Sequence, residues 1–328
     1  MRSYALTKAS TVGPIADIVA ASGGSITKVF RKAELPLTLL EQPQRLILLR
    51  DQFHLLETAA RTIGDHSLAV RLSTEAGIPG LGAYGAHLIT LPTLGEAILE
   101  SSRSLASLLQ GATTIALAVE GRWAKWTYCV TENLGLGQQK NEMLAIGYML
   151  GLLRYFAGPR WTPDRVEVAG RFDGRREIEK VVSCDVISGD RAGVVFPARL
   201  LALTNPRPPQ DREPDYPPVP AETEFSEVVR HILLLQLDQG EAGIDSVARR
   251  LGLSRRTLQR RLSEQGVSFE GLAQRTVRDQ ARGLLEETEV PITDIAYELG
   301  YSDPAHFTRA FRRWTGETPQ QWRRRLVQ

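Results

Sequence analysis

The feature of the sequence that most constrains its fold is a repeat near the end of the chain. IDSVARRLGLSRRTLQRRL (244–262) aligns with ITDIAYELGYSDPAHFTRAF (292–311), and both copies place apolar residues at the three- and four-residue spacing of a helix. Each copy is interrupted by a glycine, which permits a positive φ, and then by a serine, which is suited to a helix N-cap. These pairs are Gly252 with Ser254 and Gly300 with Ser302. Each copy is therefore predicted to form a helix, a tight turn and a second helix.

The segment between the copies, GLAQRTVRDQARGLLEET, also has a helical pattern. A single helix-turn-helix pattern is only a moderate signal, because two helices around a glycine are common. Two copies that begin 48 residues apart, at Ile244 and Ile292, are much more specific. Residues 225–328 are therefore predicted to form an all-α domain with two helix-turn-helix motifs joined by a helix.

At this point the sequence resembles the C-terminal domain of AraC/XylS-type transcription regulators, over about residues 225–326. The most specific stretch is DIAYELGYSDPAHFTRAFRRWTGETPQQWR. Earlier in the chain, RLILLRDQFHLLETAARTIGD, LGAYGAHLITLPTLGEAI and WTPDRVEV resemble the arabinose-binding-type sensor domain of one subfamily. The resemblance implies an activator that binds double-stranded DNA, responds to a small-molecule effector, forms a homodimer and acts on RNA polymerase.

The first recognition helix is predicted to read bases. Leu258 and Leu262 lie one turn apart and are expected to face the core, so the opposite face meets DNA. The side chains expected on that face are Arg256, Gln259 and Arg260, with Arg255 and Arg261 at its flanks on phosphates. Arginine reads guanine and glutamine reads adenine in the major groove, each with two hydrogen bonds. The alternative is a solvated arginine-rich surface.

The second recognition helix has a different composition. Phe307 and Phe311 are expected to face inward. The residues expected to face DNA are Ala305, His306, Arg309, Arg312 and Arg313. Because proline and alanine begin this helix, it is predicted to hold the DNA backbone and to read about one base, through Arg309.

A proline-rich stretch divides the chain. Residues 205–224, NPRPPQDREPDYPPVPAETE, contain seven of the 18 prolines and predict an exposed, extended spacer. Residues 1–204 are predicted to form an α+β sensor and dimerisation domain. Its expected elements are helices within 14–78, 92–110 and 138–158, a hairpin over 113–132, a strand at 165–172 and a second hairpin over 185–197.

Six side chains of this first domain are candidates for binding the effector. They combine aromatic surface with polar groups, as small-molecule sites do. They are Trp123, Trp126, Tyr128, Tyr148, Arg154 and Arg171. The alternative is that the aromatic side chains belong to the core and the arginines to the surface.

The segment GLGAYG (80–85) has the spacing G-x-G-x-x-G of dinucleotide-binding turns. That turn needs a hydrophobic strand before it and an acidic residue on a second strand after it. Here a polar, broken segment with Pro79 precedes the glycines, and a helix follows. The segment is therefore predicted to be a loop between two helices, and no cofactor is expected.

Neither catalysis nor metal binding is expected. Cys129 and Cys184 have no metal-binding spacing, and Cys129 has no nearby histidine to activate it. With no secretory signal and no apolar run of about 18 residues, the protein is expected in the cytoplasm with no membrane partner. Two alternatives stay open: an effector-independent regulator whose first domain only dimerises, and an enzyme domain fused to a DNA-binding tail.

Overall fold

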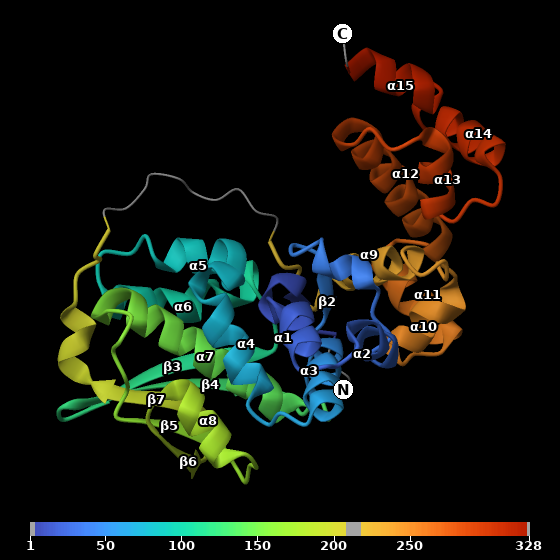
Figure 1. Cartoon of the computed structure of the whole chain (residues 1–328). Helices are drawn as coiled ribbons and strands as arrows, with labels where there is room; N and C mark the ends of the chain where they lie inside the picture. Colours follow the sequence, from blue (N-terminus) through green and yellow to red (C-terminus); the bar gives the residue numbers. More distant parts are fainter. Residues whose placement is uncertain (1–3, 208–217, 327–328) are drawn as a thin grey trace. The chain divides into compact units, whose positions relative to one another are not determined.

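The computed structural model describes residues 4–207 and 218–326, which belong to two compact units, Met1–Glu222 and Thr223–Gln328 (Figure 1). Most of the predicted spacer, residues 208–217, lies outside the described residues. The described parts on either side of it are anchored to the first unit. The Asn205 amide donates hydrogen bonds to the carbonyl oxygens of Ile89 and Leu91, at 2.6 and 2.9 Å, and the buried Val219 donates its N–H to Ser107 at 2.7 Å. The expectation that all of 205–224 is exposed is therefore wrong at these two positions.

The first unit is built on a mixed five-stranded sheet, which confirms the predicted combination of helices and strands. The strand order is β3-β4-β7-β5-β6, and only the β5–β6 pair is parallel. The strands are β3 (Thr113–Glu120), β4 (Trp123–Val130), β5 (Arg165–Ala169), β6 (Asp185–Gly189) and β7 (Ala192–Pro197). The predicted first hairpin is present, with Glu120 opposite Trp123 at its tip.

The predicted second hairpin is absent, because β5 lies between β6 and β7. The short turn after Gly189 has the composition of a hairpin turn, but the residues after it contradict that interpretation. All five residues from Ala192 to Phe196 are buried, as in a central strand that needs a neighbour on each side. In β6 only Val186 is buried, which suits a strand at the edge of the sheet.

Helices α6, α7 and α8 contact the sheet, and α4 packs on both α7 and α8 (Figure 1). The α-helices are α1 (Ile15–Ala21), α2 (Ile26–Lys32), α3 (Leu49–Ile63), α4 (Leu68–Ala76), α5 (Gly82–Leu88), α6 (Leu94–Leu108), α7 (Gln138–Ala157) and α8 (Arg175–Val182). The 3₁₀ turns are η1 (Ala9–Val12), η2 (Leu37–Leu40), η3 (Ile78–Leu81) and η4 (Ala198–Ala202).

One strand lies inside the range predicted as helical. Residues Leu46–Leu48 form β2, which pairs with β1 (Leu6–Lys8). All three β2 residues are buried. In a helix, three consecutive residues point in different directions, so a short apolar run of this kind could belong to either structure. The pattern of apolar residues in the sequence therefore could not distinguish this short strand from a helical turn.

The closest helix packing in the first unit is between α4 and α7. A β-carbon added to Gly147 of α7 would lie 2.0 Å from the Ser73 hydroxyl and 2.8 Å from the Val70 carbonyl oxygen. Gly151, one turn later in the same helix, would meet nothing closer than 3.6 Å. The approach of α4 thus depends on the missing side chain of Gly147.

Replacing Gly147 with alanine is expected to destabilise the first unit by about 1–3 kcal/mol, because the added methyl overpacks the α4–α7 contact. Gly151→Ala is the matched control, expected to stabilise by about 0.5–1 kcal/mol because alanine favours a helix more than glycine does. Urea unfolding of both variants measures the difference. Equal changes in the two variants would contradict the close approach at Gly147.

The second unit is all-helical and contains the two predicted helix-turn-helix motifs. Its helices are α9 (Phe225–Leu237), α10 (Ile244–Leu251), α11 (Arg255–Glu264), α12 (Phe269–Glu287), α13 (Ile292–Glu298), α14 (Pro304–Thr315) and α15 (Pro319–Leu326). The pairs α10–α11 and α13–α14 are the two motifs, and α12 joins them. Gly252 and Gly300 have φ of 66° and 80°, as the turn prediction requires.

The N-caps of the two recognition helices differ. The Ser254 hydroxyl accepts a hydrogen bond from the Thr257 N–H at 3.1 Å, as predicted. In the second motif Asp303, not Ser302, is the cap, and it accepts from the Ala305 N–H at 2.8 Å. The cause is Pro304, which suits the first helical position and disfavours helical backbone at the residue before it.

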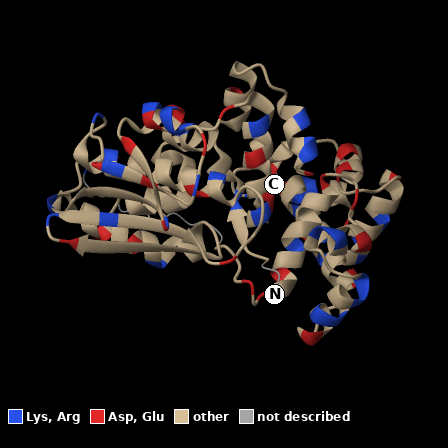
Figure 2. Ribbon diagram, turned by 90° about the horizontal axis from the view of Figure 1, so that it is seen from below, with Lys and Arg blue, Asp and Glu red and all other residues tan. Residues whose placement is uncertain are grey.

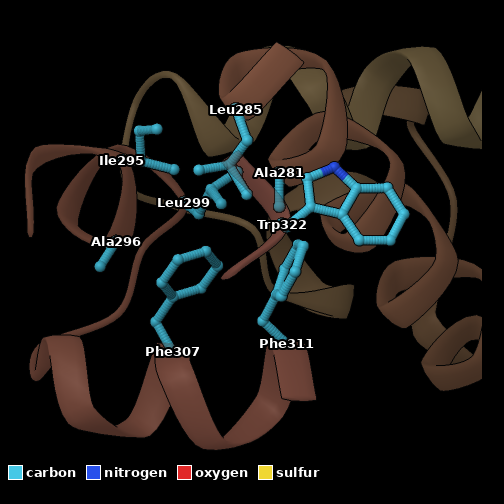
Figure 3. Packing of buried hydrophobic residues seen from close by; sticks show 8 residues of the cluster. All are labelled: Ala281, Leu285, Ile295, Ala296, Leu299, Phe307, Phe311 and Trp322. Carbon is cyan, nitrogen blue, oxygen red and sulfur yellow. The ribbon is translucent and has the colours of Figure 1, made fainter. Parts of the chain in front are cut away.

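The second motif is held by a buried cluster of apolar side chains (Figure 3). Phe307 and Phe311 extend from α14 toward Leu285, Leu299 and Trp322. The two phenyl rings are 5.8 Å apart, and the Phe311 ring meets the Trp322 ring edge-on, also at 5.8 Å. This cluster sets which face of α14 remains outside.

Candidate DNA-binding surface and candidate effector cavity

The buried side of α11 determines its exposed side. Leu258 and Leu262 have no exposed surface, so side chains on the opposite side of the helix point outward. Arg256, Gln259 and Arg260 are exposed on or beside that side. Arg255 is also exposed, but as the first residue of the helix, seven residues before Leu262, it lies toward the side of the leucines. The structure thus brings together on one face the hydrogen-bonding groups that could meet base edges.

The arginines of α11 have different partners. Arg260 forms an ion pair with Glu264 one turn later, at 2.5 Å, and Arg255 lies 3.7 Å from Asp245. Both pairs are largely exposed, and such pairs contribute little to stability. Among the described residues Arg256 has no ion-pair partner.

Arg261, the fifth predicted residue, is half-buried and faces α9. Its guanidinium carbon lies 4.0 Å from the centre of the Phe225 ring, a cation–π contact. This contact ties α11 to the first helix of the unit. A phosphate would have to approach Arg261 from the side of the guanidinium that Phe225 does not cover.

Helix α14 exposes all the residues predicted to face DNA, because Phe307 and Phe311 take up its inner side. These exposed residues are Ala305, His306, Arg309, Arg312 and Arg313. Arginine positions along the helices of this unit are blue in Figure 2. The α14 face has positive charge but begins with Pro304 and Ala305, whose side chains cannot donate hydrogen bonds.

The first unit has a partly open cavity between the sheet and the helices that cover it. It is lined by residues of η1, η3, α5, α6, α7, β3 and β4, most of them apolar, such as Leu81, Leu105 and Met149. The cavity volume is about 50 Å³, counted as the region in which the centre of a water molecule can lie. This volume is enough for a few non-hydrogen atoms.

The polar side chains around the cavity form a connected network. The side-chain amides of Gln110 and Asn141 donate to the Tyr128 hydroxyl, at 2.6 and 2.8 Å, and Gln52 donates to Asn141 at 2.7 Å. The Tyr148 hydroxyl donates to the carbonyl of Thr11 at 3.0 Å. Burial raises the pKa of the Tyr128 and Tyr148 hydroxyls, so both stay protonated and neutral.

Three of the six sequence-predicted effector residues line this cavity: Trp126, Tyr128 and Tyr148. The other three are not among its lining residues. Trp123 lies under the Arg122 guanidinium at 5.1 Å, Arg154 donates to the carbonyls of Trp161 and Val182, and Arg171 is exposed.

Sequence reasoning did not identify four polar residues of the cavity wall: Thr11, Tyr84, Gln110 and Asn141. A signal existed for one of them. Asn141 lies two turns before Tyr148 on α7, and residues spaced by about seven share a helix face. The other three come from η1, α5 and the end of α6, which only the tertiary structure brings to β4.

The glycine fingerprint has another structural role. Residues 80–85 form the end of η3 and the first turn of α5, so the predicted loop is wrong. A 3₁₀ turn, not a strand, precedes them, and a β-carbon on Gly85 would lie 2.3 Å from the Ile78 carbonyl oxygen. The glycines therefore allow η3 and α5 to pack closely.

Three observations bear on chemistry other than DNA binding. Within residues 4–207 and 218–326, no three His, Cys, Asp or Glu side chains are grouped as metal ligands. In the same ranges, no helix has the length and apolar character needed to span a membrane. Burial raises the pKa of the Cys184 thiol to about 11, which keeps it protonated and poorly nucleophilic near neutral pH.

Two helix-turn-helix motifs, each with an exposed arginine-bearing second helix, define a DNA-binding protein of the helix-turn-helix class. A family model for the N-terminal arabinose-binding domain of AraC transcription regulators matches residues 23–205, more than half of the chain. A helix-turn-helix domain model matches residues 247–325. The chain therefore belongs to the AraC family of transcription regulators.

Similar proteins are themselves regulators. The ornithine utilization regulator of Pseudomonas aeruginosa is 24% identical over 318 residues, which cover 94% of this chain and 93% of that protein. The transcriptional regulator VirS of Mycobacterium tuberculosis is 35% identical over 105 residues, 32% of this chain and 31% of VirS. The activator RhaS of Escherichia coli is 42% identical over 81 residues, 24% of this chain and 29% of RhaS. The matches to VirS and RhaS thus span about a third of each relative.

Proposed function

We propose that this protein is a cytoplasmic, non-enzymatic transcription regulator that binds a specific DNA sequence and is controlled by a small-molecule effector. The observation that carries the proposal is the exposed face of α11, where Arg256, Gln259 and Arg260 stand opposite two fully buried leucines. A side-chain set of this kind can make bidentate hydrogen bonds to guanine and adenine in the major groove.

The two recognition helices have different tasks in this proposal. Helix α11 reads bases, with Arg255 and the partly covered Arg261 on phosphates. Helix α14 holds the backbone through Arg312 and Arg313, and Arg309 reads about one base. Backbone contacts fix the position of the protein on DNA, and base contacts supply the sequence preference.

In the first unit the effector occupies the cavity behind β4. The cavity favours this proposal over the alternative of a first unit that only dimerises, because dimerisation needs no cavity inside the unit. We also propose that the first unit supports a homodimer and that the regulator is an activator that acts on RNA polymerase; the relative RhaS is named a transcriptional activator.

Selection of binding sites from random duplex DNA by the full chain tests the proposed function. The recovered site for one subunit should contain two short blocks about 10 base pairs apart, centre to centre, because two recognition helices enter successive turns of the major groove. The triple variant Arg256→Ala, Gln259→Ala, Arg260→Ala is the control and should recover no common sequence. If the unaltered chain also recovers none, sequence-specific binding is contradicted.

A further inference from the structure

One side chain of the cavity wall, that of Trp126, has a polar group without a hydrogen-bond partner in the part of the chain that the structure describes. The side chain of Trp126, on β4, is 3% exposed, and its indole Nε1–H meets no hydrogen-bond acceptor among the described residues. Trp126 is one of the residues that line the cavity. A buried N–H donor without an acceptor loses its hydrogen bond to water and gains none in return, so such donors are rare in folded proteins and call for an explanation, such as a bound molecule that supplies the acceptor.

The other polar side chains of the wall are already satisfied within the protein. The Tyr84 hydroxyl donates to the Ser101 carbonyl at 2.9 Å and the Tyr148 hydroxyl to Thr11 at 3.0 Å. The Tyr128 hydroxyl accepts hydrogen bonds from the side-chain amides of Gln110 and Asn141. Among the described lining residues, the indole N–H of Trp126 is thus the one buried polar group with no partner at all, and a bound molecule finds it within a mostly apolar wall.

The described wall residues also include no acidic or basic side chain that could balance the charge of a bound ion. None of the described lining residues is Asp, Glu, Lys, Arg or His. Glu142, next to the lining residue Asn141, accepts a hydrogen bond from Gln138 at 3.2 Å instead. An ion placed in such a cavity would lose its hydration and gain no countercharge, which is strongly unfavourable.

We infer that the cavity binds a small, neutral, largely apolar molecule that has one hydrogen-bond acceptor, and that this acceptor meets the indole N–H of Trp126. Sugars fit this wall poorly, because several hydroxyls would be buried against mostly apolar side chains. Charged amino acids fit poorly for lack of a countercharge. The inference rests on the proposed function only in calling this molecule the effector.

A matched set of five-membered rings tests the inference on the full chain. Cyclopentanone is neutral with one acceptor, methylenecyclopentane has the same shape without it, and cyclopentylammonium is charged. Binding is followed by NMR on the indole N–H of Trp126 and on the methyl group of Met149, which also lines the cavity. L-Arabinose and L-ornithine are titrated in parallel.

Cyclopentanone should shift the Trp126 N–H resonance saturably, and methylenecyclopentane should bind roughly five- to tenfold more weakly, the usual net effect of one hydrogen bond. Trp126→Phe should weaken cyclopentanone binding by a similar factor, measured at Met149. Trp123→Phe, on the same strand but outside the lining residues, should not weaken it. Cyclopentylammonium, arabinose and ornithine should give no saturable shift.

The inference is overturned if cyclopentanone leaves the Trp126 resonance unmoved up to its solubility limit. It is also overturned if arabinose, ornithine or the ammonium probe binds more tightly. If Trp126→Phe does not fold, the comparison of probes on the unaltered chain still decides. The titrations involve no DNA, so a failed site selection would remove the regulator proposal without affecting this result.

Discussion

Replacing Phe311 with alanine is expected to lower the free energy of unfolding of the second unit by about 3–5 kcal/mol, the usual cost of removing a buried phenyl ring. Phe311 has no exposed surface, and its ring lies 5.8 Å from the rings of both Phe307 and Trp322. Because the cluster also orients α14, specific DNA binding should fall as well.

Hydrogen exchange of the full chain, read peptide by peptide, measures this effect separately in each unit. Peptides from residues 292–326 should lose protection, and peptides from α7 should keep it. Arg309→Ala on the same helix is the control, with an expected change within about 0.5 kcal/mol because the side chain is exposed. Equal losses in the two variants would show that the cluster does not hold α14.

Replacing Arg260 with alanine is expected to weaken binding to the selected DNA site by about 1–3 kcal/mol, with a much smaller loss on scrambled DNA. The exposed guanidinium can form two hydrogen bonds to guanine. Its ion pair with Glu264 in the free protein does not prevent this, because an exposed pair of this kind holds the side chain by only about 0.3–0.5 kcal/mol. Competition binding at two salt concentrations gives both affinities.

Glu264→Ala is the matched control, since it breaks the same ion pair and keeps the guanidinium. This variant should bind the selected site at least as tightly as the unaltered chain, because it removes a negative charge near DNA. Arg313→Ala should weaken both DNAs nearly equally and reduce the salt dependence by about one unit, as expected for a phosphate contact. If Arg260→Ala behaves like Arg313→Ala, Arg260 holds phosphate and reads no base.

The contact between Arg261 and Phe225 changes how the arginines of α11 are interpreted. From the sequence, Arg255 and Arg261 are equivalent flanking residues. In the structure Arg255 is exposed beside Asp245, whereas Arg261 packs on an aromatic ring of α9. Helix periodicity gives the direction of a side chain, but it does not say which other helix lies in that direction.

The sequence by itself determined the organisation of the second unit. The evidence for each helix-turn-helix lies within about twenty residues: a helical apolar pattern, a glycine in the turn and a capping residue. These are local signals, and a local signal is sufficient where neighbouring segments pack on each other. Even the misplaced cap at Ser302 has a local cause, the backbone restriction before Pro304.

Only the tertiary structure decided the strand order and the cavity of the first unit. The turn between β6 and β7 is locally suited to a hairpin, but the sheet places β5 between them, because the buried residues of β7 need two neighbours. The cavity also depends on contacts between segments that are far apart in the sequence. Trp123 and Trp126 lie on one strand, and alternation places them on opposite faces. Which face meets α6 and α7, and therefore which tryptophan has a buried N–H without an acceptor, depends on contacts between segments far apart in the chain.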